Sequence, residues 1–522
     1  MDRALTHRLN RRSLIARAGT VTTVGALAAS IPTLTAQDVV RAALQQDGGK
    51  ITIGQVGDIQ NLIPYALLFL NYPFIENVYD QLFRLDHEVK LNPALAESYE
   101  ISDDGLLITL KIRQGVTYHS GNPMTTEDVV ANLEWARTAD AAENLLLNNM
   151  VAVSEIRAVD ESTVEIAFNE PAAYFESAMG LQPVVEPAFL EKMKSEASGT
   201  GAFMVQEWVP GDHLTMVKNP NYWNEGRPLV DEAEVRIFAD EGALVSALEG
   251  GVIDIALSFP PREYERLKDS FGFLQGQPGA NFYYLGLSAK VPPFDNKLVR
   301  QAMAHAIDRE TMVENVLFGV GAPIMTPFPD YSPAYFPEHN ELYPYDLERA
   351  KALLEEAGQG EGFSFSIPAP SGFPEFGKFA EILQADLATI GVEVSIEPMD
   401  SAQWYPILID GTYEATFSFA GGTQLYPTRI SLSGNFPGKG NVAWPDGNAP
   451  EAYAQGLAEA DATFNPDEQR AALKKMADSF MDEAWNLPIS FRTTLFAFSN
   501  AINGLDGGVY DQLRLDQVTK GA

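Results

Sequence analysis

The stretch from Gly199 to Ala256 constrains the fold of this 522-residue chain more than any other stretch. Two short alternating runs, residues 202–208 and 213–218, flank the turn-forming sequence Pro210-Gly211-Asp212, which predicts a β-hairpin. The pattern then predicts a loop, a strand, a helix and a second strand, over residues 219–228, 235–240, 243–248 and 252–257. A helix between two strands predicts a sheet with helices packed on it.

The composition excludes several classes of protein. The chain has no cysteine, which excludes disulfides, thiolate metal sites, a cysteine nucleophile and a lipid-modified amino-terminal cysteine. Its 36 basic and 71 acidic residues give a formal net charge of −35, which argues against nucleic acid and anionic membranes as partners. With 46% hydrophobic residues the chain can bury folded cores, and its length predicts about two to four domains.

Residues 1–36 are typical of a twin-arginine export signal. Arg11 and Arg12 are followed by Ser13-Leu14-Ile15, and residues 18–31 form a weakly apolar run of small side chains. Residues 34–36 offer a cleavage site, and a polar linker follows over 37–48. We therefore expect the protein in the periplasm or at the outer face of the cytoplasmic membrane. The alternative interpretation is a disordered or uncleaved amino-terminal anchor.

Helix-capping residues predict several further elements. Thr125 and Asp128 have the spacing of a capping box, and Asp308 and Asp346 stand at the start of helices over 309–318 and 346–357. Other helices are predicted over 74–83, 298–307, 379–390 and most of 449–483, and strands over 50–54, 107–112, 392–396, 412–419 and 487–499. Because helices and strands alternate, we predict an α/β fold.

Three groups of residues carry a resemblance to a known family. They are Gly199-Thr200-Gly201 with Asn219-Pro220-Asn221-Tyr222-Trp223 and Gly251-x-x-Asp254; Arg113-x-Gly115-Val116-x-Tyr118-His119-x-Gly121-x-Pro123; and Val299-Arg300-Gln301-Ala302-Met303-x-x-Ala306-Ile307-Asp308-Arg309. In this order they resemble extracellular solute-binding protein family 5, the dipeptide-, oligopeptide- and nickel-binding receptors of ABC importers. Taken alone, Tyr222 and Trp223 are loop anchors, Asp254 is a capping or turn acid, and His119 has a surface or turn role.

The resemblance implies a periplasmic-binding-protein-like α/β fold of type II, cluster C, with two lobes, an extra small domain and a hinged cleft. It implies a first domain from residues 49–86, 199–287 and 487–522, a second domain over 87–198 and a third over 288–486. The strands at 281–286 and 487–499 are expected to cross between domains. The implied function is a receptor that captures a peptide or peptide-like small polar solute and delivers it to an ABC permease. We expect a monomer with no cofactor.

The sequence departs from the family pattern at the step that binds a peptide's amino terminus in relatives. In peptide-binding relatives an aspartate in an Asp-Pro step pairs with this group, whereas the step here is Tyr426-Pro427, with no acid between it and Gly421. An enclosed ammonium without a partner would cost roughly several kcal/mol. We therefore expect a ligand that depends less on a positive end, unless another acid replaces the aspartate, and the acids near in sequence are Asp400, Asp410 and Glu414.

Ligand contacts are predicted for the loop at 421–426 and for residues expected to approach it. The residues are Tyr65, Asn281, Tyr283, Phe419, Gly421, Gly422, Thr423, Gln424, Tyr426 and Arg429. Glycines let the backbone approach a ligand closely, and Thr423, Gln424 and Tyr426 offer hydroxyl and amide groups. Arg429 is a candidate partner for a ligand carboxylate. The alternatives are core packing for Tyr65, and a surface loop with Arg429 as a solvated charge.

Other functions remain open on the same sequence. A receptor for an opine, a sugar-containing solute or a nickel or other metal chelate would use the same fold, and a chaperone-like or adhesion role would fit an exported acidic protein. An exported hydrolase is more remote, because the chain has no GxSxG, no HExxH and no complete GxxxxGK motif. Six scattered histidines show no metal-ligand spacing. We predict that the chain is not an enzyme and has no metal site.

Overall fold

The computed structural model describes residues 48–66, 71–86, 88–138, 150–276, 281–421, 426–432, 443–444, 449–506 and 513–521. Residues Asp47–Ala522 form one compact unit, distinct from the unit Met1–Gln46. The predicted export signal and nearly all of the predicted linker therefore lie outside the described residues. Within the described ranges, no helix combines the length and the apolar character needed to cross a membrane.

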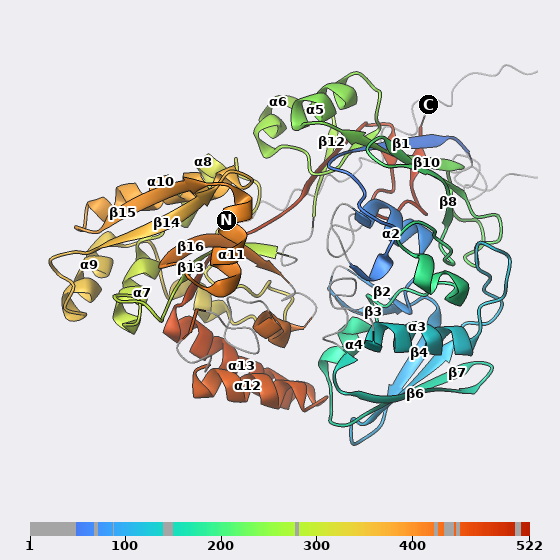
Figure 1. Cartoon of the computed structure of the whole chain (residues 1–522), viewed down its shortest axis with the longest axis horizontal. Coiled ribbons are helices and arrows are strands. Elements are labelled where there is room, and N and C mark those ends of the chain that lie inside the picture. The colour runs from blue at the N-terminus through green and yellow to red at the C-terminus, as the bar shows by residue number, and fades with distance from the viewer. Residues whose placement is uncertain are drawn as a thin grey trace, which may run out of the picture. The chain divides into compact units, whose positions relative to one another are not determined.

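A seven-stranded mixed sheet brings together segments that are far apart in the sequence (Figure 1). Its strands, in spatial order, are β12 (Gly272–Gln275), β18 (Leu495–Phe498), β11 (Ile255–Ala256), β1 (Lys50–Val56), β10 (Glu232–Phe238), β9 (His213–Lys218) and β8 (Phe203–Val209). Among these described strands, the parallel pairs are β1 with β10 and β1 with β11. Five consecutive residues of β1 are buried, as expected for a strand covered on both faces. The predicted hairpin is confirmed as β8 and β9, and the predicted helix is α5 (Glu241–Glu249).

A four-stranded antiparallel sheet lies between β1 and that hairpin in the sequence. Its strands, in spatial order, are β4 (Ala96–Ile101), β5 (Leu107–Ile112), β7 (Thr163–Phe168) and β6 (Val153–Asp160). Helix α3 (Thr126–Thr138) packs against β6 and β7, and α4 (Tyr174–Ala178) follows β7. The predicted capping box is confirmed, because Thr125 N–H donates to Asp128 Oδ2 at 2.9 Å and Asp128 N–H donates to Thr125 Oγ1 at 3.3 Å.

The helix predicted over 74–83 begins earlier and is shorter, as α2 (Tyr72–Val78). Tyr79 is already extended, with φ −121° and ψ 134°. The next residue, Asp80, is buried and accepts hydrogen bonds from side chains distant in the sequence, and β2 (Phe83–Leu85) pairs with β3 (Leu91–Pro93). These tertiary contacts end the helix before its apolar pattern does.

A three-stranded antiparallel sheet is built from β16 (Ala415–Gly421), β13 (Asn281–Leu287) and β17 (Asn486–Phe491), with β13 in the centre. The parallel pair β14 (Ser364–Pro370) and β15 (Glu393–Met399) lies beside it, since β14 contacts β16. The chain passes from β12 to β13 and again from β17 to β18, so it connects the three-stranded and seven-stranded sheets twice. These are the two segments predicted to cross.

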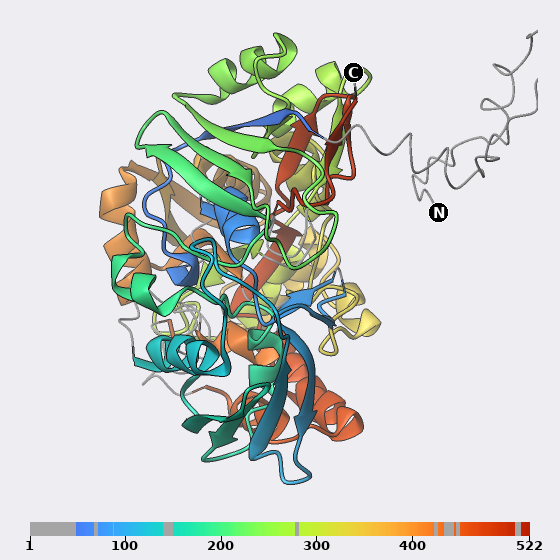
Figure 2. The same ribbon diagram turned by 90° about the vertical axis from the view of Figure 1, so that its right-hand side faces the viewer.

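Helices surround this second group of strands. They are α7 (Lys297–His305), α8 (Arg309–Val316), α9 (Leu347–Glu356), α10 (Pro374–Ala388), α11 (Ser401–Asp410), α12 (Glu451–Asp461) and α13 (Pro466–Glu483). The caps predicted for α8 and α9 are confirmed: Thr311 N–H donates to Asp308 Oδ1 and Arg349 N–H donates to Asp346 Oδ1, both at 2.9 Å. α10 begins five residues before the predicted Phe379, because Pro374 occupies its first turn, where a missing N–H costs nothing. α12 and α13 pack against each other (orange in Figures 1 and 2).

The remaining elements are short. They are α6 (Tyr264–Leu267), β19 (Ile502–Asn503), β20 (Thr519–Lys520), and the 3₁₀ turns η1 (Pro64–Ala66), η4 (Pro187–Lys192), η5 (Pro261–Glu263), η6 (Pro337–Glu341) and η7 (Pro427–Leu432). Buried apolar side chains form one large cluster around the four-stranded sheet, α2 and part of the seven-stranded sheet, a second around the three-stranded sheet, and a small third cluster beneath α5. The crossing segments join the first and second clusters.

Candidate functional site

Four of the predicted ligand-contact residues meet where β13 begins and β16 ends. Asn281 pairs with Gly421, and Tyr283 pairs with Phe419, in the antiparallel register of the two strands. Residues two apart on a strand share a face of the sheet, and so do directly paired residues. The structure therefore places these four residues on one face, at one end of the three-stranded sheet.

Arg492, the residue directly after β17, joins this group and was not among the predicted contacts. Its backbone N–H donates to the backbone carbonyl of Asn281 at 2.8 Å. Its guanidinium carbon lies 5.0 Å from the centroid of the Phe419 ring. Among the described residues, no carboxylate lies within 4.0 Å of the guanidinium nitrogens. The signal that could have found Arg492 is that it is the only charged residue in the predicted strand 487–499.

The hydroxyl of Tyr283 contacts one carboxylate and is also influenced by a nearby guanidinium. It donates to Glu375 Oε1 at 3.4 Å, and the side chain is only 7% exposed. Burial raises the pKa of Tyr283 to about 12, while the nearby Arg492 guanidinium acts to lower this pKa and the Glu375 carboxylate acts to raise it. The phenol therefore keeps its proton at neutral pH and acts as a donor to Glu375.

Aromatic side chains from α10 and α11 form a wall beside Phe419. Phe373 lies 5.6 Å from Phe419 and 5.5 Å from Trp404, measured between ring centroids. Tyr405 continues the group at 6.5 Å from Phe373 and is 44% exposed. An aromatic wall next to an arginine and a carboxylate suits a solute that has both charged groups and an apolar or ring-shaped part.

Tyr426 and Arg429 lie in another environment. The Tyr426 hydroxyl donates to the Ala460 carbonyl at 2.8 Å and accepts from Gln469 Nε2 at 2.7 Å. Arg429 Nη2 lies 2.8 Å from Asp461 Oδ2, and only 14% of the Arg429 side chain is exposed. The carboxylate that Arg429 meets in this structure is thus one of the protein's own, and the alternative of a solvated charge does not describe it.

Tyr65 is fully buried between α3 and the loop before η4. Its hydroxyl donates to Asn132 Oδ1 at 2.5 Å, and its ring lies 4.5 Å from that of Trp135. These contacts match the packing alternative considered for this residue. The remaining predicted contacts, Gly422, Thr423 and Gln424, lie outside the described residues.

The three acids considered as replacements for the missing aspartate have other roles or are remote. Asp400 caps α11 in a capping box with Gln403, and Asp410 is an exposed residue at the end of the same helix. Glu414 accepts from the N–H and hydroxyl of Ser366, at 2.8 and 2.9 Å. Glu375, which sequence spacing did not suggest, is the acid that contacts the group around Tyr283.

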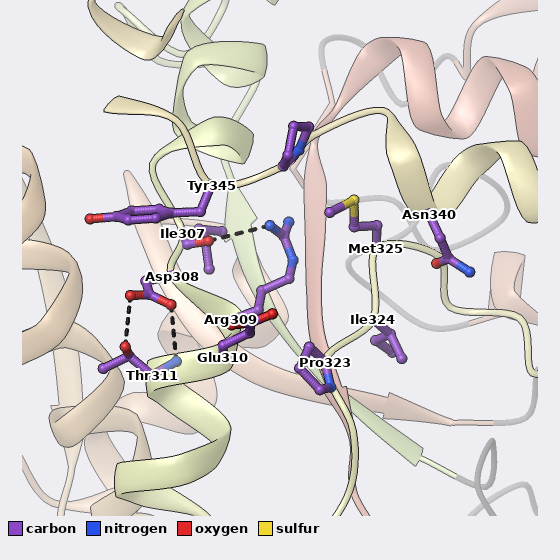
Figure 3. Close-up of a pocket in the computed structure, with 11 residues that line it drawn as sticks. Ile307, Asp308, Arg309, Glu310, Thr311, Pro323, Ile324, Met325, Asn340 and Tyr345 are labelled. Atoms are coloured by element: carbon purple, nitrogen blue, oxygen red, sulfur yellow. Dashed lines mark hydrogen bonds between the residues drawn. The ribbon is translucent and has the colours of Figure 1, made fainter. Parts of the chain in front are cut away.

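A separate cavity of about 490 Å³ lies at the start of α8 (Figure 3). Arg309 is buried there and donates to the backbone carbonyls of Pro488, Ala304, Ile307 and Tyr343, and burial lowers its pKa to about 10. The Asp308 carboxylate accepts hydrogen bonds from the backbone N–H and the hydroxyl of Thr311. Because Arg309 and Asp308 already serve the fold, the group at β13, β16 and β17 is the better candidate site. Among the described residues, no set of three or more His, Asp or Glu side chains is placed to hold a metal ion.

The comparisons with known proteins agree with this architecture. The chain matches a glutathione-binding protein, GsiB, from Escherichia coli O1:K1 / APEC, at 30% identity over 366 residues, which are 68% of this chain and 70% of that protein. The binding protein AgaA from A. tumefaciens R10, solved with agropinic acid, superposes with a TM-score of 0.76 at 23% identity, covering 91% of this chain and 99% of AgaA. The DppA protein from Helicobacter pylori, solved with the peptide STSA, gives a TM-score of 0.75 at 23% identity, covering 92% and 100%.

The fold is therefore that of the periplasmic binding proteins. The profile of the bacterial extracellular solute-binding proteins, family 5, matches residues 90–443, and the chain belongs to this family. The predicted α/β periplasmic-binding-protein-like fold and the role as the solute-binding receptor of an ABC importer are confirmed.

Proposed function

We propose that this chain captures a small peptide or peptide-like solute through a carboxylate group that Arg492 binds. The observation that carries the proposal is the state of Arg492. This guanidinium is stacked on Phe419 beside Asn281 and Tyr283, and no described carboxylate neutralises it. Glutathione, the peptide STSA and agropinic acid, which the compared proteins bind, all carry carboxylates. Bidentate pairing of a guanidinium with a carboxylate is strong and directional.

The two chain crossings support a binding mechanism by enclosure. A solute held at β13, β16 and β17 lies on the segments that connect the two groups of strands, so closing one group onto the other would bury it. A ligand that touches both sides favours the closed state, which is the form that the permease would recognise. No bond is made or broken in this cycle, so the chain acts as a receptor and not as an enzyme.

The proposed receptor acts outside the cytoplasm, so the chain must be exported. The twin-arginine pattern at Arg11 and Arg12 supports delivery of the chain across the cytoplasmic membrane, and the absence of cysteine leaves no site for lipid attachment at an amino-terminal cysteine. The receptor would then act as a monomer in the periplasm or at the outer face of that membrane, in contact with its ABC permease.

Native mass spectrometry of the protein purified from its own cells identifies a bound solute first. We expect a released molecule with a carboxylate. Release of a solute that has no carboxylate, or of a metal chelate held through metal contacts, would contradict the assignment of Arg492 while leaving the receptor class intact.

Calorimetric titration of variants then tests the residue. We expect Arg492→Gln to weaken binding of the identified solute by about 2 kcal/mol or more, because the ligand carboxylate loses an enclosed charge partner. Arg492→Lys should recover part of the loss, since it keeps the charge without the planar fork. Arg470→Gln is the matched control: Arg470 also lies over an aromatic ring, 4.7 Å from Phe336, but away from the site. Equal affinity in wild type and Arg492→Gln would overturn the proposal.

A further inference from the structure

Glu375 is a second charged group of the site without a partner of opposite charge. It stands at the second position of α10, and among the described residues no lysine, arginine or histidine nitrogen lies within 4.0 Å of its carboxylate. Within the described part of the chain, its carboxylate accepts one hydrogen bond, the weak 3.4 Å contact from the Tyr283 hydroxyl. A half-exposed carboxylate that accepts one long hydrogen bond keeps most of its acceptor capacity for another donor.

Arg492 and Glu375 are close to one hydroxyl yet do not pair with each other. Both charges act on Tyr283, while no ion pair within 4.0 Å joins them. Three different elements fix this arrangement. Tyr283 is held by edge-to-face contacts with Phe376 and Phe379, at 6.3 and 5.6 Å, Arg492 is stacked on Phe419, and Glu375 is carried by the first turn of α10. The protein thus presents a cation and an anion near one phenol, each held by a different part of the fold.

From this geometry we infer that Glu375 and Arg492 bind the ammonium and the carboxylate of one α-amino-acid head group, with the Tyr283 hydroxyl between them. The inference rests on the proposed function, and it adds the ligand's second charge. Two opposite charges carried on one carbon atom match two opposite protein charges that flank one hydroxyl. Each would gain a charge-assisted hydrogen bond, and the head group would bring no net charge into the cleft.

This inference changes the expectation drawn from the Tyr426-Pro427 step. The missing aspartate suggested a ligand that depends less on a positive end. The acid instead comes from Glu375, about fifty residues earlier in the sequence, on an element that packs against β16. A free ammonium therefore has a partner in this site, at a different position from the family's usual aspartate.

Two isomeric probes test the inference, γ-Glu-Cys-Gly and α-Glu-Cys-Gly, both titrated calorimetrically into the full chain. They have equal composition and net charge, but only the γ isomer keeps an ammonium and a free carboxylate on one carbon. We expect the γ isomer to bind about tenfold more tightly or better, N-acetylation to remove that advantage, and Glu375→Gln to weaken the γ isomer about tenfold while leaving the acetylated form unchanged.

Glu348→Gln is the matched control for Glu375→Gln. Glu348 also occupies the second position of a helix, α9, and is exposed, so its loss reports the contribution of an acid to a helix start without any ligand contact. Thermal unfolding of both variants shows that each folds. If Glu375→Gln and Glu348→Gln both leave the affinity for the γ isomer unchanged while Arg492→Gln lowers it, the inference is overturned and the carboxylate proposal stands. If neither isomer binds and the natural solute has no carboxylate, both fail.

Discussion

Arg429 Nη2 lies 2.8 Å from Asp461 Oδ2, and the same guanidinium lies over the ring of Tyr174, 3.9 Å from its centroid. Tyr174 belongs to α4, whose Phe175 packs on Phe168 of the four-stranded sheet, whereas Asp461 ends α12, which packs against α13. The N–H of Ala173 adds a hydrogen bond to the Asp461 carbonyl at 3.1 Å. Arg429 therefore joins two groups of elements that the sequence places far apart.

A double-mutant cycle measures this junction. We expect Arg429→Gln and Asp461→Asn to show a coupling free energy of about 1 kcal/mol or more in urea unfolding, because the pair is largely shielded from water. The control pair is Lys475 and Glu459, which also approach to 2.7 Å but are exposed, and we expect about 0.5 kcal/mol or less there. A coupling no larger than that of the control would show that the junction contributes little.

Asp80 joins two pieces of the first family motif group, around Thr200 and around Tyr222 and Trp223. Its carboxylate accepts from Thr200 Oγ1 at 3.1 Å, from the Tyr222 hydroxyl at 3.1 Å and from Trp223 Nε1 at 2.7 Å, and it pairs with Arg84 at 2.9 Å. The loop-anchor interpretation of Tyr222 and Trp223 is confirmed by these bonds. Through these four partners, the Asp80 carboxylate fixes the loop that carries Tyr222 and Trp223 to the segment after α2.

We expect Asp80→Asn to lower the free energy of unfolding by about 3 kcal/mol, because the amide cannot accept all four bonds and leaves Arg84 poorly compensated. Urea denaturation followed by tryptophan fluorescence measures this loss. Asp330→Asn, at an exposed position, serves as the control and should stay within about 0.5 kcal/mol of wild type. A loss for Asp80→Asn within the same limit would mean that the loop anchors do not depend on this carboxylate.

The features that sequence reasoning predicted correctly are those whose cause is local. The caps at Asp308, Asp346 and Thr125 depend on a side chain and an N–H three residues away, so their spacing is visible in the sequence. The β8–β9 hairpin depends on one turn and two alternating runs.

The features that it missed depend on pairs distant in the chain. Nothing near Tyr79 in the sequence shows that Asp80 is recruited by Trp223 and ends α2. Likewise, Arg492 reaches Phe419 only because β13 pairs with β16 on one side and β17 on the other. The sequence was enough to predict that the candidate site involves β13 and β16 of the three-stranded sheet. It was not enough to predict the charged groups of the site.

Gly201 is needed because the backbone of α2 passes very close to it. A Cβ atom at this position would lie 2.5 Å from the Asn77 carbonyl oxygen, which belongs to rigid helix backbone. We expect Gly201→Ala to destabilise the protein by about 1–3 kcal/mol, the usual cost of overpacking.

Calorimetric unfolding temperatures measure this loss, and Gly377→Ala is the contrasting variant. Gly377 lies within α10, and its added methyl group would meet only Ala369 Cβ at 3.7 Å, an ordinary contact. We expect a gain of about 0.5–1 kcal/mol from helix propensity. Equal effects of the two substitutions would argue against the close approach at Gly201.

The buried His119 makes the stability of the fold depend on pH. Gly199 N–H donates to its Nδ1 at 3.3 Å, so its Nε2 carries the proton and donates to the Gly201 carbonyl at 3.1 Å. Burial lowers the pKa of His119 from 6.5, although Asp80 and Glu186 lie near enough to oppose this shift. The unfolded chain therefore binds more protons than the folded chain once the pH is below about 6.5. The stability is full above that value and falls as the pH falls through it toward the folded pKa.

The variant His119→Gln tests this dependence, because its amide still donates to Gly201 but does not titrate. We expect its unfolding temperature to decline less steeply than that of wild type as the pH falls below about 6.5. His213→Gln should act in a different pH range: the pKa of His213 is raised by its hydrogen bond to Asp212, so its stabilisation is complete below about 6.5 and is lost as the pH rises through the folded pKa. We expect this variant to lose less stability than wild type as the pH rises above about 6.5. Parallel curves for wild type and His119→Gln would show that His119 is as easily protonated in the folded chain as in the unfolded one.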